Sequence, residues 1–250
     1  MRAQRREFLA EGPQAVGEAL ADSMCLEVLA TAGGTERSAD LLATATATQV
    51  TWTVVDDDVL AALSGTVSPQ GVVARCRFVD VPLDLLLAPS PRLLALCADV
   101  RDPGNAGTVI RCADAAGADA VVLTGSSVDP YNPKVVRASV GSIFHVGLAI
   151  APDPIVVTDA VRGAGLTVIA ADADADLDLD GAIDSGLLDA PTAWLFGNEA
   201  WGLPDPVRAL ADRVVNVPIH GRAESLNLAT AAAVCLYASA RAQRRSATAG

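Results

Sequence analysis

The sequence predicts an α/β protein of two domains, in which a small α/β domain precedes a larger one with a mostly parallel sheet. Segments with strand-like and helix-like patterns alternate along almost the whole length of 250 residues. A short run that contains two prolines, residues 88–91, interrupts the alternation, and proline disfavours helix in the residue before it. We therefore expect one domain over residues 1–88 and a second over residues 91–250.

Residues 1–88 carry the pattern of a small α/β domain. Predicted helices cover residues 13–21 and 36–45, and a third, capped by the aspartates at 56–58, runs to residue 63. Predicted strands cover residues 24–29, 51–55 and 72–78. The last of these strands follows a turn signal, Ser68-Pro69-Gln70-Gly71.

Residues 91–250 have a more regular pattern, because runs that are apolar throughout alternate with helical segments. The predicted strands are 93–98, 120–124, 166–170, 193–196 and 214–219. Strands that are apolar on both sides indicate a parallel sheet with helices on both faces. A final helix from residue 226 to about residue 244 carries several alanines, which would let another helix approach closely, either within the chain or across a dimer.

Composition argues against several classes of protein. Hydrophobic residues make up 51% and charged residues 19%, and no apolar run reaches the roughly 18 residues that a membrane helix needs. The N-terminus lacks the apolar stretch of a secretory signal, so we expect a cytoplasmic protein with no membrane partner. The net charge of -12 disfavours a nucleic-acid partner, although many of the acidic residues lie between Asp172 and Asp189.

No metal site is predicted. The five cysteines are scattered without a CxxC pair and the chain has only two histidines, which argues against a zinc cluster. Aspartate alternates with alanine or leucine over residues 172–180, but Leu177 and Ile183 stand where a calcium loop needs glycine and glutamate. We interpret this stretch as a solvated acidic loop.

Three segments combine a strand end, a loop and a helix start with polar residues. In the first, Asp102–Arg111, a turn with glycines opens a helix whose backbone amides favour an anion. Alternatively, Asn105 only caps this helix and Arg111 pairs with Asp114. The segment lacks the GxGxxG pattern, which argues against a nicotinamide-dependent enzyme.

The second and third segments also follow predicted strands. Asn198 and Glu199 stand between two glycines at a strand end, where ligands bind in open α/β sheets, although an ordinary turn would look similar. In residues 217–228, Ser225 can cap the last helix, which leaves Asn227 in its first turn without a structural explanation. His220 has the chemistry of a general base, but nothing in the sequence places it near a substrate.

Taken in order, the three segments resemble the three motifs of the SpoU family of RNA ribose 2'-O-methyltransferases, in the SPOUT superfamily. The resemblance covers about residues 91–245 and includes Asn132–Gly141. Residues 8–12 and 68–73 are similar to the N-terminal substrate-binding domain of ribosomal-RNA members, which favours large-subunit rRNA over tRNA as the substrate. A tRNA methyltransferase and an RNA-binding or ribosome-assembly protein without turnover are the alternatives.

The resemblance implies a trefoil knot in the second domain, a homodimer, and S-adenosylmethionine as the cofactor. It implies cofactor contacts from five residues: Thr124, Gly197, Val217, Ile219 and Leu226. It also implies that Arg111 acts on the ribose hydroxyl, beside four other polar residues of the catalytic site: Asn105, Glu199, Ser225 and Asn227. Because a guanidinium stays protonated, our hypothesis is that Arg111 binds the adjacent phosphate and stabilises the developing alkoxide.

Overall fold

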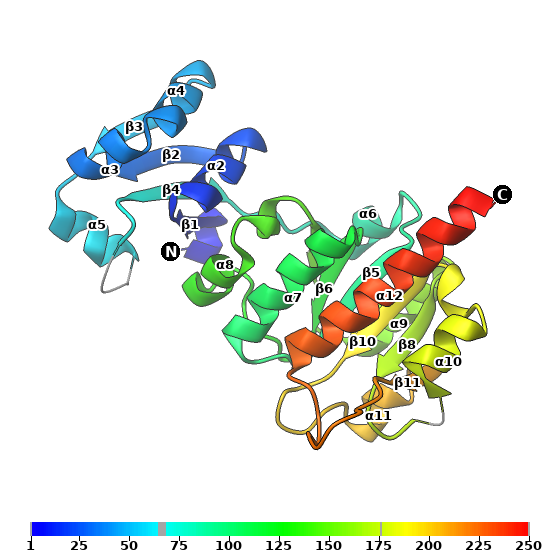
Figure 1. Ribbon diagram of the computed structural model, residues 1–250. Coiled ribbons are helices and arrows are strands. Elements are labelled where there is room, and N and C mark those ends of the chain that lie inside the picture. The colour runs from blue at the N-terminus through cyan, green and yellow to red at the C-terminus, as the bar shows by residue number, and fades with distance from the viewer. Residues whose placement is uncertain (1, 65–68, 176, 250) are drawn as a thin grey trace. The chain divides into compact units, whose positions relative to one another are not determined.

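The computed structural model describes residues 2–64, 69–175 and 177–249, and the chain divides into two compact units (Figure 1). The first unit comprises Met1–Val79 together with Asp129–His145. The second comprises Asp80–Val128 and Val146–Gly250. Each unit has its own sheet and helices, so the α/β class and the presence of a small N-terminal α/β unit are confirmed.

The division between the units differs from the predicted boundary at residues 88–91. The chain leaves the first unit after Val79, and helix α6 (Leu83–Leu87) already contributes Leu86 and Leu87 to the core of the second unit. The two prolines therefore mark a loop inside the second unit, directly before strand β5 (Leu93–Ala98).

The first unit is built on a four-stranded sheet with the order β1-β4-β2-β3. Its strands are β1 (Glu7–Glu11), β2 (Cys25–Ala30), β3 (Thr51–Val54) and β4 (Val72–Arg77). Strands β2, β3 and β4 confirm the three strands predicted for this part of the chain. The pattern does not predict β1, because five residues that begin and end with glutamate give too short an apolar alternation.

Among the described residues, five helices of the first unit precede β4. They are α1 (Arg2–Arg5), α2 (Pro13–Ala21), α3 (Ala32–Arg37), α4 (Ala39–Ala47) and α5 (Asp57–Ser64). The single helix predicted over 36–45 is wrong, because the backbone leaves helical geometry at Ser38 and two helices meet there. Ser68, the first residue of the predicted turn before β4, lies outside the described residues.

An aromatic cluster holds the segment Asp129–His145 in the first unit. The ring centroid of Tyr131 lies 3.7 Å from that of Phe78 and 4.9 Å from that of Phe8. The Tyr131 hydroxyl also accepts a hydrogen bond from the backbone amide of Val79 at 2.8 Å. Such ring pairs stabilise the folded state by about 0.5–1.5 kcal/mol each, beyond the burial of their area. The segment therefore packs with the N-terminal residues. It contains α8 (Pro133–Ser139) and η1 (Ser142–Phe144).

The second unit is built on a parallel sheet with the order β7-β6-β5-β10-β8-β11-β9. Besides β5, its strands are β6 (Ala120–Thr124), β7 (Gly147–Ile150), β8 (Thr167–Ala171), β9 (Leu177–Asp178), β10 (Thr192–Phe196) and β11 (Arg213–Asn216). The five predicted strands are confirmed, although β11 ends at Asn216 rather than at residue 219. Strands β7 and β9 are too short for the pattern to indicate them.

Helices cover both faces of this sheet (Figure 1). They are α6, α7 (Pro103–Ala116), α9 (Pro154–Gly163), α10 (Leu179–Asp184), α11 (Asp205–Arg208) and α12 (Leu228–Ala249), with the 3-10 turn η2 (Leu187–Asp189). On one face α12 packs beside α7, and Trp194 of β10 donates from Nε1 to Ser239 of α12 at 2.9 Å. On the other face Leu195 packs in a cluster with Val157 of α9. Among the described helices, none has the length and apolar character needed to cross a membrane.

Candidate active site

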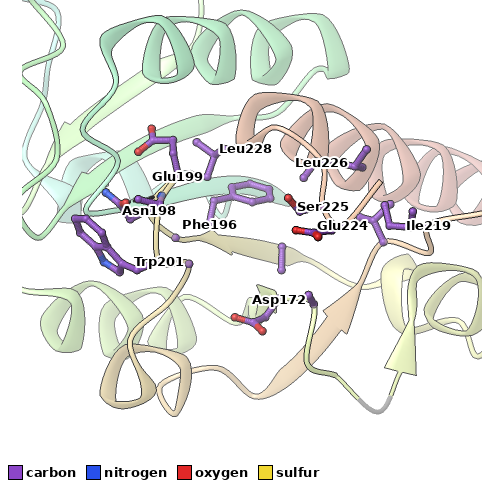
Figure 2. A pocket seen from close by; sticks show the side chains of 17 residues that line it. Asp172, Phe196, Asn198, Glu199, Trp201, Ile219, Glu224, Ser225, Leu226 and Leu228 are labelled. Atoms are coloured by element: carbon purple, nitrogen blue, oxygen red, sulfur yellow. Dashed lines mark hydrogen bonds between the residues drawn. The ribbon is translucent and has the colours of Figure 1, made fainter. Parts of the chain in front are cut away.

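A cavity of about 390 Å³ lies where the carboxyl ends of β8, β10 and β11 meet (Figure 2). The loops that follow these three strands supply most of its wall, and the start of α12 closes one side. All three strands are parallel, so their carboxyl ends share one edge of the sheet. This is the edge where open α/β sheets bind ligands, and the volume suits a small molecule.

The loop after β10 is closed by a tight backbone bridge. Asn198 and Gly202 exchange two hydrogen bonds of 2.8 and 2.9 Å, and Gly202 adopts a φ of 68°. A Cβ added at Gly197 would lie 2.4 Å from the Gly202 carbonyl carbon, so only glycine fits there. The buried side chain of Asn198 accepts from Ala200 N at 2.8 Å and donates to the Asp99 carbonyl at 2.7 Å, which fixes the loop against the end of β5.

The carboxylate of Glu199 connects this loop to the start of α7. Its two oxygens accept hydrogen bonds from the backbone amides of Arg101, at 3.5 Å, and Asp102, at 3.3 Å. Asp102 in turn caps α7, because its carboxylate accepts from Asn105 N at 2.8 Å. The alternative in which Asn105 itself caps the helix is therefore wrong, and its side chain is left for another role.

The third loop meets α7 through Asn227. Its Oδ1 accepts from Ala229 N at 2.9 Å and from Thr230 N at 3.3 Å, so Asn227 caps α12. Its Nδ2 donates to Asn105 Oδ1 at 2.9 Å. The prediction that Ser225 caps this helix is wrong, because α12 begins two residues later than expected, at Leu228.

The structure brings most of the predicted site residues together. Six of them line the cavity: Gly197, Glu199, Val217, Ile219, Ser225 and Leu226. Asn227 follows the last of these and holds Asn105 by the hydrogen bond between their amides. The three segments singled out in the sequence thus meet, although they are far apart in the chain.

Besides Asn105 and Asn227, three more predicted or considered residues do not line the cavity. Thr124 is buried at the end of β6, and β5 separates that strand from β10. Arg111 is exposed on α7, six residues after Asn105 and so about 9 Å further along the helix axis. His220 is exposed in the loop after β11.

Sequence reasoning missed several residues of the cavity wall, of which Asp172, Trp201 and Glu224 carry polar or aromatic chemistry. Asp172 was hidden in the stretch interpreted as a solvated acidic loop. That interpretation is wrong for part of the stretch, because β9 lies within it and α10, capped by Asp178, begins at its end. The useful signal for Asp172 is its position directly after the apolar strand β8.

A buried thiol lies near the carboxyl end of β5, the strand beside β10. Cys97, at the end of β5, is fully buried, and this burial, with a smaller effect from the Glu199 carboxylate, raises the pKa of its thiol to about 12. The thiol is therefore neutral near pH 7 and a poor nucleophile. The described residues contain no group of three side chains placed to bind a metal ion.

The two ends of the cavity differ in character. Ile219 and Leu226 lie at one end, and Trp201, Asn198 and Glu199 lie at the other (Figure 2). Such a cavity can hold a flat apolar ring between aliphatic side chains and can keep a positively charged group near carboxylates. It lies next to the amino-terminal turn of α7, which the third loop joins through Asn227.

The chain is similar to known RNA methyltransferases over nearly its full length. Residues 92–237 match the model of the SpoU rRNA Methylase family, and residues 1–74 match the MRM3-like substrate binding domain. It is 32% identical to the 23S rRNA (guanosine(2553)-2'-O)-methyltransferase RlmP of Bacillus subtilis, over 94% of this chain and 89% of that protein.

Solved structures agree with this similarity. The SpoU methyltransferase AviRb from Streptomyces viridochromogenes, in complex with AdoMet, superposes with a TM-score of 0.83 at 32% identity and covers 98% of this chain and 93% of its own. An AdoMet-bound rRNA methyltransferase from Sinorhizobium meliloti gives a TM-score of 0.81 at 31% identity, over 96% of this chain and 89% of its own.

Proposed function

The chain belongs to the SpoU rRNA methylase family, and we propose that this S-adenosylmethionine-dependent enzyme methylates a ribose 2'-hydroxyl of large-subunit ribosomal RNA. The observation that carries the proposal is the meeting of the three motif segments: the second and third line one cavity, and both are hydrogen-bonded to the first. Glu199 ties the second segment to the first, and Asn227 ties the third to the first. The relatives named above, RlmP and AviRb, support the choice of ribosomal RNA and of the cofactor.

The residues of the cavity fit S-adenosylmethionine. The aliphatic side chains of Val217, Ile219 and Leu226 would hold the adenine ring. Asp172 and Glu199 also line the cavity, and their negative charges favour a molecule with positive charge. When bound, the cofactor supplies a methyl group on a positively charged sulfur. Thr124, outside this wall, is the weakest of the proposed cofactor contacts.

The chain's own residues have to hold the ribose hydroxyl in line with the methyl group that it attacks, and to ease the loss of the hydroxyl proton. Arg111 would bind the neighbouring phosphate and stabilise the developing alkoxide with its forked donors, since its guanidinium stays protonated. Asn105, Ser225 and Asn227 would position the RNA and keep the loops closed.

We propose that the enzyme is a homodimer and that Arg111 serves the cavity of the partner. The support is the placement of Arg111, which is exposed on α7 and does not line the cavity of its own chain. In addition, α12 presents the large side chains of Val234 and Tyr237 at its surface, with exposures of 38% and 53%. A second copy would cover such a surface.

The remaining features follow from membership of the family. We propose a trefoil knot in the second unit, around the loops that line the cavity. The first unit, Met1–Val79 with Asp129–His145, would bind the RNA, and the second unit would form the methyltransferase domain. Because the proposed substrate is ribosomal RNA, we place the enzyme in the cytoplasm.

Transfer of labelled methyl from S-adenosylmethionine tests the function. Large-subunit rRNA, small-subunit rRNA and tRNA are offered separately, and the products are digested with alkali. We expect label in the large rRNA, in a dinucleotide that resists alkali because its 2'-hydroxyl is methylated. Label in tRNA instead would identify tRNA as the substrate. Binding of the cofactor without methyl transfer to any RNA would favour an RNA-binding protein without turnover. The Asn227→Ala variant provides the low-activity control.

A further inference from the structure

Trp201 stands out as a large aromatic side chain that is 53% exposed at the mouth of the cavity. We propose that its indole stacks on a base of the substrate RNA next to the target nucleotide, and so helps to select the sequence that is methylated. The proposal rests on the proposed function, because it assigns a substrate contact to the same site.

The loop presents Trp201 from a rigid frame. The backbone bridge between Asn198 and Gly202 closes the loop around it. The Asn198 side chain anchors the loop to the Asp99 carbonyl. The Glu199 carboxylate accepts from the backbone amides of Arg101 and Asp102. An aromatic ring that is fixed before binding loses little conformational freedom when a base stacks on it.

Arg101 completes the frame. Its guanidinium carbon lies 5.1 Å from the centroid of the indole ring, in a cation–π contact. Among the described residues, this is the one ring or cation contact recorded for Trp201. A ring with a guanidinium against it is a common platform for single-stranded nucleic acid, because every base has a flat face to stack.

The charges around Trp201 favour a base over a phosphate. Glu199 is its near neighbour in the loop, and the Asp172 carboxylate lies 3.9 Å from where a Cβ would stand at Gly202. These carboxylates would repel a phosphate, whereas a base is neutral. The Arg101 guanidinium against the ring offsets only one of these two negative charges, so stacking on the indole is the interaction that this end of the cavity offers to RNA.

The position of Trp201 also separates it from the proposed adenine site. Trp201 lies at the end of the cavity opposite Ile219 and Leu226 (Figure 2). It lies instead on the side where the loop is tied to the start of α7, the helix that carries Arg111. Asn105 and Asn227, which are proposed to position the RNA, meet at this turn of α7, so a base beside the target nucleotide comes within reach of the indole.

Tryptophan fluorescence tests the contact directly. The chain has three tryptophans: Trp194 is fully buried and Trp52 is half-buried with its Nε1 bonded to Thr35. In a Trp52→Phe background, a change in emission on binding reports Trp201. We expect the large-subunit rRNA fraction, added without cofactor, to quench the emission, and we expect no quenching after the further change Trp201→Phe. Quenching by S-adenosylmethionine and not by RNA would overturn the proposal.

Kinetics provide the second readout. Stacking of one base is worth about 1–3 kcal/mol, so Trp201→Leu should raise KM for RNA at least ~5-fold. The Kd for S-adenosylmethionine and the Tm should stay unchanged, and Trp201→Phe should restore most of the RNA affinity because it keeps a ring. An unchanged KM in Trp201→Leu would overturn the stacking role while leaving the methyltransferase function intact. Quenching by RNA without methyl transfer would keep the stacking role and refute the proposed function.

Discussion

Asn227 caps helix α12 with one atom of its side-chain amide and holds Asn105, 122 residues earlier in the chain, with the other. The hydrogen bond joins the first turns of α7 and α12 beside the cavity. A single side chain thus has a structural task and a positioning task, and the two can be separated by mutation.

Asn227→Ala removes both the helix cap and the hydrogen bond to Asn105, whereas Asn227→Ser removes only the hydrogen bond to Asn105. Loss of the cap should lower the free energy of unfolding by about 1 kcal/mol in Asn227→Ala, while serine keeps a capping oxygen and should stay near wild type. Neither variant can bind Asn105, so both should lose methyl transfer by at least ~10-fold. Thermal unfolding and kcat/KM for RNA measure the two effects. A fully active Asn227→Ser enzyme would show that only the cap matters.

Gly197→Ala should prevent cofactor binding. The new Cβ would meet the backbone of Gly202 at 2.4 Å and of Leu203 at 2.6 Å, so the closed loop has to open. Calorimetric titration with S-adenosylmethionine should show at least ~10-fold weaker binding. Gly163→Ala is the matched control, because a Cβ there has no neighbour within 4 Å and alanine favours the helix. Equal affinities in the two variants would refute the steric argument.

Arg111→Lys should lower kcat by at least ~10-fold and leave the Kd for S-adenosylmethionine unchanged. Lysine keeps the charge but loses the forked donors, and position 111 does not line the cavity of its own chain. Near-normal turnover with normal RNA affinity would remove the basis for the forked-donor role.

A mixture of two inactive variants tests whether Arg111 acts across the dimer. Arg111→Ala keeps an intact cavity, and Gly197→Ala keeps an intact arginine. If Arg111 serves the partner's cavity, mixed dimers contain one complete site and activity returns to about a quarter of wild type after random exchange, since half of the dimers are mixed and each has one of two sites. Activity that stays at the level of the separate variants would place Arg111 in its own chain's site.

Two buried thiols should make the protein sensitive to alkali. Burial raises the pKa of Cys97 and of Cys235 to about 12, from 9.0 for a free thiol. Because the folded pKa lies above the unfolded one, the stability linked to each thiol is complete below pH 9 and is lost as the pH rises toward 12. Each thiol then lowers the free energy of unfolding by up to ~1.4 kcal/mol per pH unit.

Urea unfolding between pH 8 and pH 10.5 measures this slope. The free energy of unfolding of Cys235→Ala should fall less steeply with pH than that of the wild type, whatever its value at pH 8, because one buried thiol fewer ionises on unfolding. The comparison concerns the slope, since the smaller side chain also leaves a cavity that lowers stability at every pH. Identical slopes would mean that Cys235 does not contribute.

The sequence allowed the sheet of the second unit to be predicted because its central strands are apolar throughout. Residues 93–98 and 193–196 pair with neighbours on both sides and are buried on both faces. Strand β7 at the sheet edge could not be found in the same way, since four residues with an exposed Ile150 have no distinct pattern.

The site was harder to predict, because its geometry depends on contacts between distant segments. Asn198 and Glu199 could be singled out from their place at a strand end, whereas Gly197 was implied only by the resemblance to the family. The role of Asn227 as a cap could not be separated from that of Ser225, since both residue types cap helices well. Asp172 and Trp201 join the cavity only when β8 lies beside β10, which no local pattern reveals.

The first unit draws on two separate stretches of chain, and this has a consequence during synthesis. When Val79 leaves the ribosome, Phe8 and Phe78 are present but Tyr131 is not, and a further 66 residues must follow before His145 appears. At about 5–20 residues per second this takes roughly 3–13 s, during which the apolar strands β5 and β6 emerge before β10, the other neighbour of β5. The nascent chain therefore passes through a window in which neither unit is complete, and a slower passage through residues 80–145 would lengthen its exposure to aggregation.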